Sequence, residues 1–153
     1  MTNSTPKDEA LTFLKAHSLA TLATISPEGN PHARIVYYAS DDAFNVYFLS
    51  LANTRKVADI RVNPKAAVVI SDDDKQHMLQ IEGVFEEMTD TATFGPIITK
   101  LSQNLFPEDG PEAPVTHMDK AKPVFFKLAP TWVRWSNFTL GRSSAEVFAE
   151  IVP

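Results

Sequence analysis

The chain contains no cysteine, and this absence excludes several kinds of chemistry at once. Disulfide bonds, a thiolate nucleophile and cysteine-based metal sites all need a sulfhydryl group. The histidines offer no substitute, because no two of them have the spacing that would place both on one helical face. They stand at positions 17, 32, 77 and 117. We therefore expect no metal site.

A surplus of basic residues and long apolar runs are also lacking. The 153 residues include 14 Lys and Arg against 19 Asp and Glu, which gives a formal net charge of −5. Proteins that follow a nucleic-acid backbone need a basic face, so nucleic acid is not an expected partner. No apolar run is long enough to span a bilayer, and residues 1–17 lack the apolar core of a signal peptide. We expect a single cytoplasmic domain over 1–153 that does not bind membranes.

The segments that are present favour a mainly β protein. Short runs of β-branched and aromatic residues are separated by turn-forming residues, the pattern of antiparallel strands. So many strands in so short a chain favour a closed or nearly closed barrel, which leaves few exposed edges. The expected strands are residues 19–25, 31–39, 44–50, 66–70, 78–88, 124–128 and 131–136, the last two separated at Pro130.

Small helices are predicted near both ends of the chain by capping boxes. A hydroxyl side chain followed three residues later by an acid can satisfy two free N–H groups at a helix start. Thr5 and Asp8 form such a pair, and Ser143 and Glu146 form another. The second helix is expected to run to Ile151.

Residues 89–123 differ in character from the rest of the chain. Pro96 can open a helix with apolar residues on one side, but the run 106–114 holds too many prolines for regular structure. We interpret 89–123 as a surface excursion of helix and loop, which could act as a lid. No nucleophile elbow or Ser-His-Asp order supports a hydrolase.

The most informative segment is 44–56, which reads FNVYFLSLANTRK. After a strand, it places a hydroxyl, a guanidinium and an ammonium in succession at Thr54, Arg55 and Lys56. These groups suit a terminal phosphate dianion. A helix that began here, and ended before the Asn-Pro at 63–64, would add its free N–H groups. The alternative is a basic first turn on an ordinary surface helix.

Arg34 is a second candidate for the same anion. It lies in the middle of an expected strand, between Ala33 and Ile35, where an unpaired buried charge would be costly. It is either an outward-facing surface residue or a ligand of the anion. The nearby phosphate-type loop favours the second interpretation.

Three separated segments resemble one known family in order and spacing. They are RIVY at 34–37, FLSLANTRK at 48–56 and NPKAAVV at 63–69. Together they resemble the pyridoxamine 5′-phosphate oxidase-like, FMN-binding split-barrel family, over residues 19–88 with a weaker echo over 124–137. The resemblance implies a six-stranded antiparallel split β-barrel and a homodimer with FMN at its interface.

The resemblance also implies which residues contact the cofactor. Those beside the flavin ring or ribityl chain would be Ile35, Val36, Tyr37, Leu49 and Ser50. Thr54, Arg55 and Lys56 would bind the phosphate, and Arg34 would contact either the phosphate or the pyrimidine end of the flavin. The second subunit of the family supplies a glutamine, for which Gln80 is the candidate, although the spacing from Gly83 points to Met78. Trp135, in the last strand, would lie over the flavin edge.

One departure from the family concerns the substrate. Vitamin B6 oxidases carry an Arg-x-His-x-Arg cluster near the C-terminus, whereas this chain has GRSSA at 141–145, with Arg142 alone able to serve. The resemblance therefore supports the cofactor but counts against pyridoxamine phosphate. The leading hypothesis is an FMN-dependent oxidoreductase that acts on an unidentified small molecule, with NADH or NADPH as an open choice of electron donor.

Three alternatives remain open from the sequence. The first is a flavin carrier, sensor or scavenger of the same fold without turnover. The second is another cofactor, deazaflavin F420 or haem, in the same cleft. The third is a structural dimer that binds no cofactor. We expect the dimer to form through apolar strand faces such as those with Val68, Ile70 and Ile81.

Overall fold

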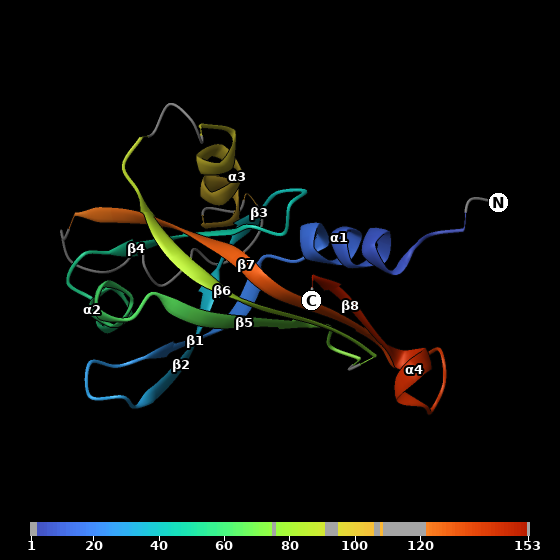
Figure 1. The fold of residues 1–153 in the computed structure, drawn as a ribbon. Coiled ribbons are helices and arrows are strands. Elements are labelled where there is room, and N and C mark those ends of the chain that lie inside the picture. The colour runs from blue at the N-terminus through green and yellow to red at the C-terminus, as the bar shows by residue number, and fades with distance from the viewer. Residues whose placement is uncertain (1–2, 75, 91–94, 106–107, 109–121, 153) are drawn as a thin grey trace.

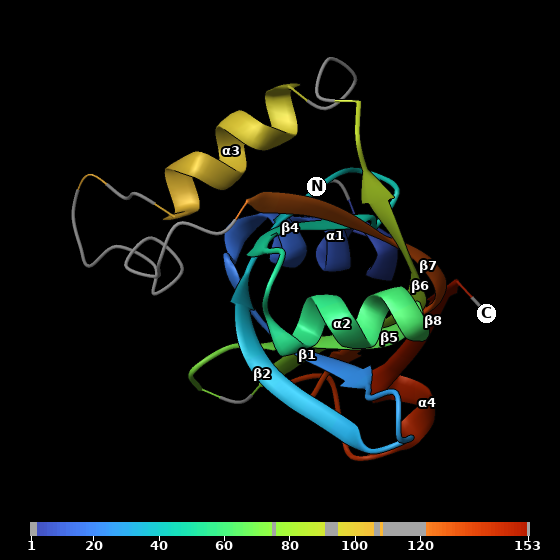
Figure 2. The ribbon, with the colours of Figure 1, turned by 90° about the vertical axis from the view of Figure 1, so that its left-hand side faces the viewer.

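The computed structural model describes residues 3–74, 76–90, 95–105, 108 and 122–152. Within them one antiparallel sheet of eight strands curls into a split barrel (Figures 1 and 2). Neighbouring strands follow the order β2-β1-β5-β6-β7-β4-β3, and β8 pairs with β7. The elements are α1 Pro6–Ala16, β1 Leu19–Ile25, β2 Pro31–Tyr37, β3 Ala39–Ser40, β4 Val46–Leu51, α2 Arg55–Val62, β5 Lys65–Ser71, β6 His77–Met88, α3 Gly95–Leu105, β7 Pro123–Asn137, α4 Ser144–Val147 and β8 Phe148–Val152. The predicted mainly β split barrel is confirmed, with eight strands where the family resemblance implies six.

The inside of the barrel is filled by alternate residues of each strand. Val68, Ile70 and Ile81 have only 3%, 1% and 0% of their surface exposed and belong to this core. The expectation that these three residues form a dimer face is therefore wrong. Because side chains on a strand alternate between faces, their neighbours Ala67 and Val69 lie on the outer face instead.

Two helices lie at opposite ends of the barrel (Figure 1). The N-terminus of α1 has the predicted capping box, in which Asp8 N donates to Thr5 Oγ1 and Thr5 N donates to Asp8 Oδ2. At the other end, α2 lies across the opening of the barrel (Figure 2) and buries Val57 and Ile60 in the core. The first turn of α2 is thus held at the rim of the barrel.

The predicted strand over 31–39 is divided at Tyr38. The Tyr38 side chain is fully buried, and its hydroxyl donates to the carbonyl oxygen of Leu14 at 2.6 Å. Burial raises the pKa of this hydroxyl well above its ordinary value, so it remains a donor. The chain leaves β1 at this point and pairs with β4 through the short strand β3.

The C-terminal segment also departs from its prediction. The capping box at Ser143 and Glu146 is present, but α4 has four residues and ends at Val147. Residues Phe148–Val152 form β8, which pairs with β7. Phe, Ile and Val favour a strand, and a sheet edge is available to receive them, so the strand prevails over a longer helix.

The segments expected as two strands around Pro130 are one strand, β7. Its register with β6 shifts beside Gly83, where Glu82 pairs with Trp132 but Gly83 pairs with Pro130. Thr131 is the extra residue, and its hydroxyl donates to the carbonyl oxygen of Glu82 at 3.3 Å. This bulge accommodates the proline without ending the strand.

Helix α3 packs outside the barrel against β3 and β4 (Figure 2). Its Leu101 and Leu105 are buried beside Ala39, and Asn104 Nδ2 donates to the carbonyl oxygen of Tyr38 at 2.8 Å. Most of the rest of the predicted 89–123 excursion lies outside the described residues. None of the helices in the described residues combines the length and the apolar character needed to cross a bilayer.

Candidate functional site

A cleft of about 570 Å³ lies between β2 and the first turn of α2, and we call it the cationic cleft. Its lining includes three positively charged side chains, Arg34, Arg55 and Lys56, and no carboxylate. Arg34 and Lys56 are half-buried, whereas Arg55 is exposed. The structure therefore brings together the cations that the sequence singled out.

The first turn of α2 offers further donors to this cleft. Thr54 occupies the N-cap position, but its hydroxyl donates to the carbonyl oxygen of Leu51 and lies 3.0 Å from Ser50 Oγ, so it does not cap the helix. In the described part of the chain, the backbone N–H groups of residues 55–57 make no hydrogen bond. Free N–H groups at a helix start favour an anion.

Arg34 points inward and is not an ordinary surface arginine. Its side chain is 24% exposed, and Nη1 donates to Thr24 Oγ1 at 2.6 Å while Nη2 lies 3.4 Å from Asp59 Oδ2. Burial lowers the pKa of Arg34 and also that of Lys56, which Arg34's own charge lowers further. The cleft thus gathers three cations near a single buried carboxylate, that of Asp59.

Asp59 and His32 complete the cluster, and the sequence analysis missed both. The Asp59 carboxylate is 2% exposed and accepts hydrogen bonds from Thr24 Oγ1 at 2.8 Å and from His32 Nδ1 at 2.7 Å. Burial alone would raise the pKa of Asp59, but the hydrogen bonds from His32 and Thr24 outweigh it, so the pKa lies below its ordinary value. His32 Nε2 lies 2.6 Å from Arg55 Nη2.

Simple periodicities could have suggested these two residues. His32 and Arg34 stand two apart on a strand and share a face, whereas Arg55 and Asp59 stand four apart on a helix and share a side. The sequence does not show that this face of β2 packs against this side of α2.

The residues assigned to the flavin ring are distributed over both faces of the sheet. Val36 is 7% exposed and Ser50 fully buried, so both side chains belong to the interior. Tyr37 and Leu49 are partly buried against α3. Strand β2 pairs only with β1 in the described residues, so its other edge presents unpaired backbone groups beside the cationic cleft.

Gln80 and Ile35 lie on the outer face. Cross-strand pairs place Ile35, Thr21, Val69, Gln80 and Arg134 in one row across β2, β1, β5, β6 and β7. Ile35 is 69% exposed, and Gln80 Oε1 accepts hydrogen bonds from Arg134 Nε and Nη2 at 3.2 and 2.9 Å. In a single subunit this row is therefore separate from the inward-facing Arg34.

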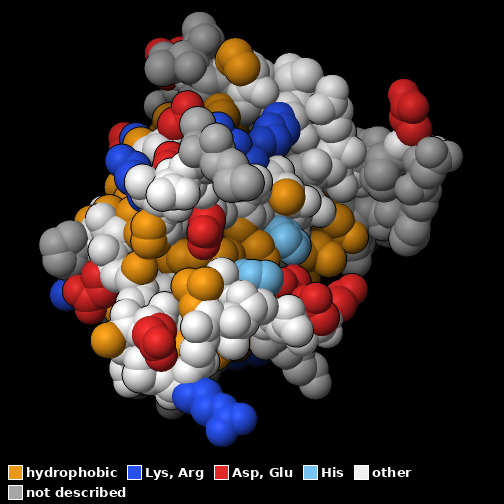
Figure 3. All heavy atoms as spheres, turned by 90° about the vertical axis from the view of Figure 1, so that its right-hand side faces the viewer, with side chains coloured by type: hydrophobic (Ala, Val, Ile, Leu, Met, Phe, Trp, Pro, Cys, Tyr) orange, Lys and Arg blue, Asp and Glu red, His pale blue; other side chains and the backbone are white. Residues whose placement is uncertain are grey.

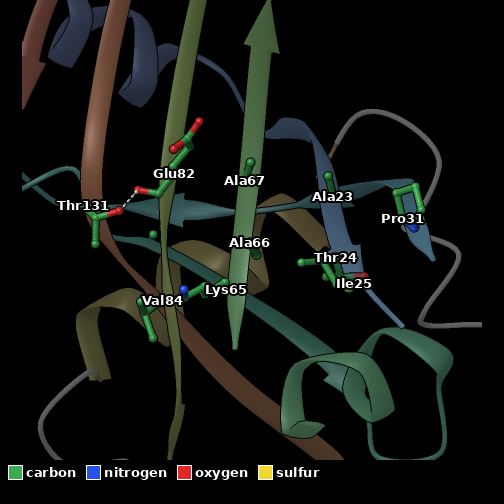
Figure 4. Close-up of a pocket in the computed structure, with 11 residues that line it drawn as sticks. Ala23, Thr24, Ile25, Pro31, Lys65, Ala66, Ala67, Glu82, Val84 and Thr131 are labelled. Carbon is green, nitrogen blue, oxygen red and sulfur yellow. Dashed lines mark hydrogen bonds between the residues drawn. The ribbon is translucent and has the colours of Figure 1, made fainter. Parts of the chain in front are cut away.

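A hollow of about 470 Å³ lies beside this row (Figure 4). Ala23, Ala67 and Val84 contribute apolar side chains to it, and Figure 4 shows their strands β1, β5 and β6 side by side. The outer face over β1, β5 and β6 is therefore hollowed and mainly apolar, with Lys65 and Glu82 also in its lining.

Trp135 does not join the other candidates. Its ring is 4% exposed and packs against Phe13 and, in a stacked arrangement, His77, while Nε1 donates to Glu9 Oε2 at 3.1 Å. Figure 3 shows this end of the barrel, where histidine side chains lie among hydrophobic ones. Trp135 therefore lies inside this subunit, and the outward positions nearby on β7 belong to Trp132 and Arg134.

The turn between β5 and β6 gathers Asp72, Asp74 and His77, whose ligand atoms lie within 4.8 Å of one another. The sequence analysis did not anticipate this group. Asp72 Oδ1 accepts the backbone N–H groups of Gln76 and His77, and Asp72 Oδ2 is bonded to His77 Nδ1. These hydrogen bonds account for the cluster as part of the turn.

A family model and a curated relative both match this chain. The family model described as pyridoxamine 5′-phosphate oxidase matches residues 6–136. A pyridoxine/pyridoxamine 5′-phosphate oxidase from Cupriavidus metallidurans is 33% identical over 84 residues, which are 54% of this chain and only 40% of that relative. The matched region thus spans less than half of the relative's length.

Two solved structures extend the similarity to the fold. A candidate pyridoxamine 5′-phosphate oxidase from Listeria innocua is 25% identical with a TM-score of 0.65, over 84% of this chain and 96% of its own. An F420 reductase is 26% identical with a TM-score of 0.63, over 80% of this chain and 93% of its own.

Proposed function

Because this chain belongs to the pyridoxamine 5′-phosphate oxidase family, we propose that it binds FMN through the cationic cleft and acts as a flavin-dependent oxidoreductase on a small molecule. The observation that carries the proposal is the convergence of Arg34, Arg55 and Lys56 on a cleft without a carboxylate in its lining. The finer points, namely the cofactor, the dimer and the substrate, are argued separately below.

The residues of the cleft fit a phosphate monoester. Arg55 offers a fork of donors, Lys56 a mobile point charge, and the first turn of α2 its free N–H groups. Arg34 and Lys56 are half-buried, so a dianion would meet less screening there than on an open surface. A phosphate would compensate the charge that burial now disfavours.

The edge of β2 is the proposed support for the flavin ring. Its unpaired backbone groups can donate to and accept from ring heteroatoms, and Ile35 and Tyr37 flank them. Bound flavin supplies hydride and single-electron transfer. The protein's own part would be to hold the phosphate in the cleft and to support the ring at the edge of β2.

We also propose a homodimer formed through the outer face. Exposed apolar side chains gather there, including Leu19 at 46%, Ile35 at 69% and Val84 at 40% exposure, beside the hollow described above. Exposed apolar side chains around a mainly apolar hollow are typical of interfaces. In such a dimer Gln80 and Arg134 of one subunit would approach the edge of β2 in the other.

Replacing Ile35 with aspartate should halve the mass of the particle. A buried unpaired carboxylate at an interface costs several kcal/mol, of the order of 3 or more. Light scattering at micromolar protein concentration measures the mass. Leu140→Asp is the control, because Leu140 is 59% exposed in the loop after β7. A wild-type monomer, or an unchanged mass for Ile35→Asp, would contradict the proposed dimer.

The proposed substrate is not pyridoxamine phosphate. The segment 141–145 keeps one arginine of the family's C-terminal cluster, and Arg142 is exposed rather than set in a pocket. A deazaflavin is the second candidate cofactor, since an F420 reductase is among the similar structures. A flavin-binding protein without turnover is the remaining alternative.

The visible spectrum of the purified protein tests these possibilities. Flavin, deazaflavin and haem have different absorption bands, and FMN can be added to protein isolated without it. Anaerobic titration with NADH and NADPH, followed by reoxidation, then separates an oxidoreductase from a carrier. The proposal fails if the protein neither retains a flavin nor binds added FMN.

A further inference from the structure

His32 links the floor of the cationic cleft to its rim. Its Nδ1 atom lies 2.7 Å from the buried Asp59 carboxylate, and its Nε2 atom lies 2.6 Å from Arg55 Nη2. A guanidinium can only donate, and Arg55 Nη2 lies closer to Nε2 than to Nδ1, which is 3.5 Å away, so the Arg55 contact falls on an unprotonated Nε2. The hydrogen bonds therefore assign His32 as neutral, with its proton on Nδ1 donated to Asp59.

The surroundings of this ring contain opposing charges. The charged groups that face it are Asp59 and Arg55 on α2, Arg34 on β2, whose Nη1 lies 3.5 Å from the His32 carbonyl oxygen, and Lys56 on the cleft lining. The carboxylate favours an imidazolium, whereas the three cations oppose it. A dianion in the cleft would neutralise the three cations, which would then no longer oppose an imidazolium at His32.

We propose that His32 takes up a proton when a phosphate monoester enters the cationic cleft and then donates a hydrogen bond from Nε2 to it. In this step the Arg55 guanidinium moves away from the His32 ring and donates its hydrogen bonds to the phosphate instead. Nε2, no longer occupied as an acceptor, takes a proton from solvent, and the new imidazolium stays bonded to Asp59 through Nδ1. His32 becomes a ligand of the phosphate in addition to the arginine and lysine side chains. The inference rests on the proposed function only for the position of the phosphate.

The sign of the pH dependence follows from proton uptake. Binding that consumes a proton weakens as pH rises, by up to about tenfold per pH unit for one proton. The useful range lies above about pH 6.5, where a phosphate monoester is already mostly a dianion and an ordinary imidazole is mostly neutral. FMN affinity should therefore decline steadily from there into the alkaline range.

Isothermal titration calorimetry with FMN, in buffers of different ionisation enthalpy, counts the protons taken up. We expect the wild-type protein to take up close to one proton near neutral pH, and His32→Gln to take up none. Glutamine can still donate to a phosphate, so the variant should bind FMN with a pH-independent affinity. Riboflavin, which has no phosphate, should bind the wild-type protein without proton uptake.

NMR of the wild-type His32 ring gives a second measurement that needs neither a variant nor flavin. Inorganic phosphate is the probe, and we expect it to move the ring's carbon-bound proton signals to imidazolium positions. FMN binding without proton uptake, or with equal uptake in His32→Gln, overturns the inference and leaves the proposed function intact. Failure to bind FMN overturns the proposed function, and a His32 ring that stays neutral in phosphate then overturns the inference as well.

Discussion

Replacing both Arg55 and Lys56 with alanine should weaken FMN binding by about a hundredfold or more and leave riboflavin binding nearly unchanged. Each charge-assisted hydrogen bond to a phosphate contributes about 1.5–3 kcal/mol, and about 1.4 kcal/mol corresponds to a tenfold change in affinity. Riboflavin lacks the phosphate, so it isolates the contribution of the cleft. Calorimetry or quenching of flavin fluorescence measures both affinities.

The matched control removes two positive charges that lie outside the cationic cleft. Arg61 lies in the last turn of α2, paired with Glu87 in an exposed contact, and Lys65 begins β5. Arg61→Ala combined with Lys65→Ala changes the net charge by the same amount but leaves the lining cations of the cleft in place. We expect its FMN affinity to stay within about twofold of wild type, since exposed pairs contribute little. Equal losses in both double variants would mean that net charge, not the cleft, determines binding.

The sequence predicted those parts of the fold that depend on local patterns. A run of small, β-branched and apolar residues that ends at a turn-forming cluster located β1 at its observed bounds, and the pair Thr5 and Asp8 located the start of α1. Prediction from the sequence failed where the local structure depends on a residue or strand that is distant along the chain. Tyr38 ends a strand because its hydroxyl reaches Leu14, 24 residues away, and the C-terminal residues form β8 because β7 has a free edge.

The candidate site shows the same division between local and distant information. Thr54, Arg55 and Lys56 are consecutive, so their joint position could be predicted from the chain alone. The hydrogen bond between His32 and Asp59 joins residues 27 positions apart and needs the packing of α2 against the sheet. The outward positions on β7 could not be counted from the sequence, because a single extra residue at a bulge moves every later side chain to the other face.

That bulge makes Gly83 the residue whose substitution should cost most stability. A Cβ atom at Gly83 would lie 2.2 Å from the carbonyl oxygen of Ala129 and 3.1 Å from Leu128 Cδ1. The carbonyl belongs to the backbone of β7, which is paired with β6 on both sides of the bulge and cannot retreat easily. Gly83→Ala should lower the free energy of unfolding by about 1–3 kcal/mol, and Gly83→Val by more.

Urea unfolding followed by tryptophan fluorescence is a suitable measurement, because Trp132 and Trp135 follow the bulge on β7. Gly95→Ala is the control, since a Cβ atom there would have no heavy atom within 4 Å. The Gly95 variant should keep its midpoint, whereas the Gly83 variant should unfold at lower urea. An unchanged midpoint for Gly83→Ala would show that β7 can shift its register, in which case Trp132 and Arg134 would have no fixed place on the outer face.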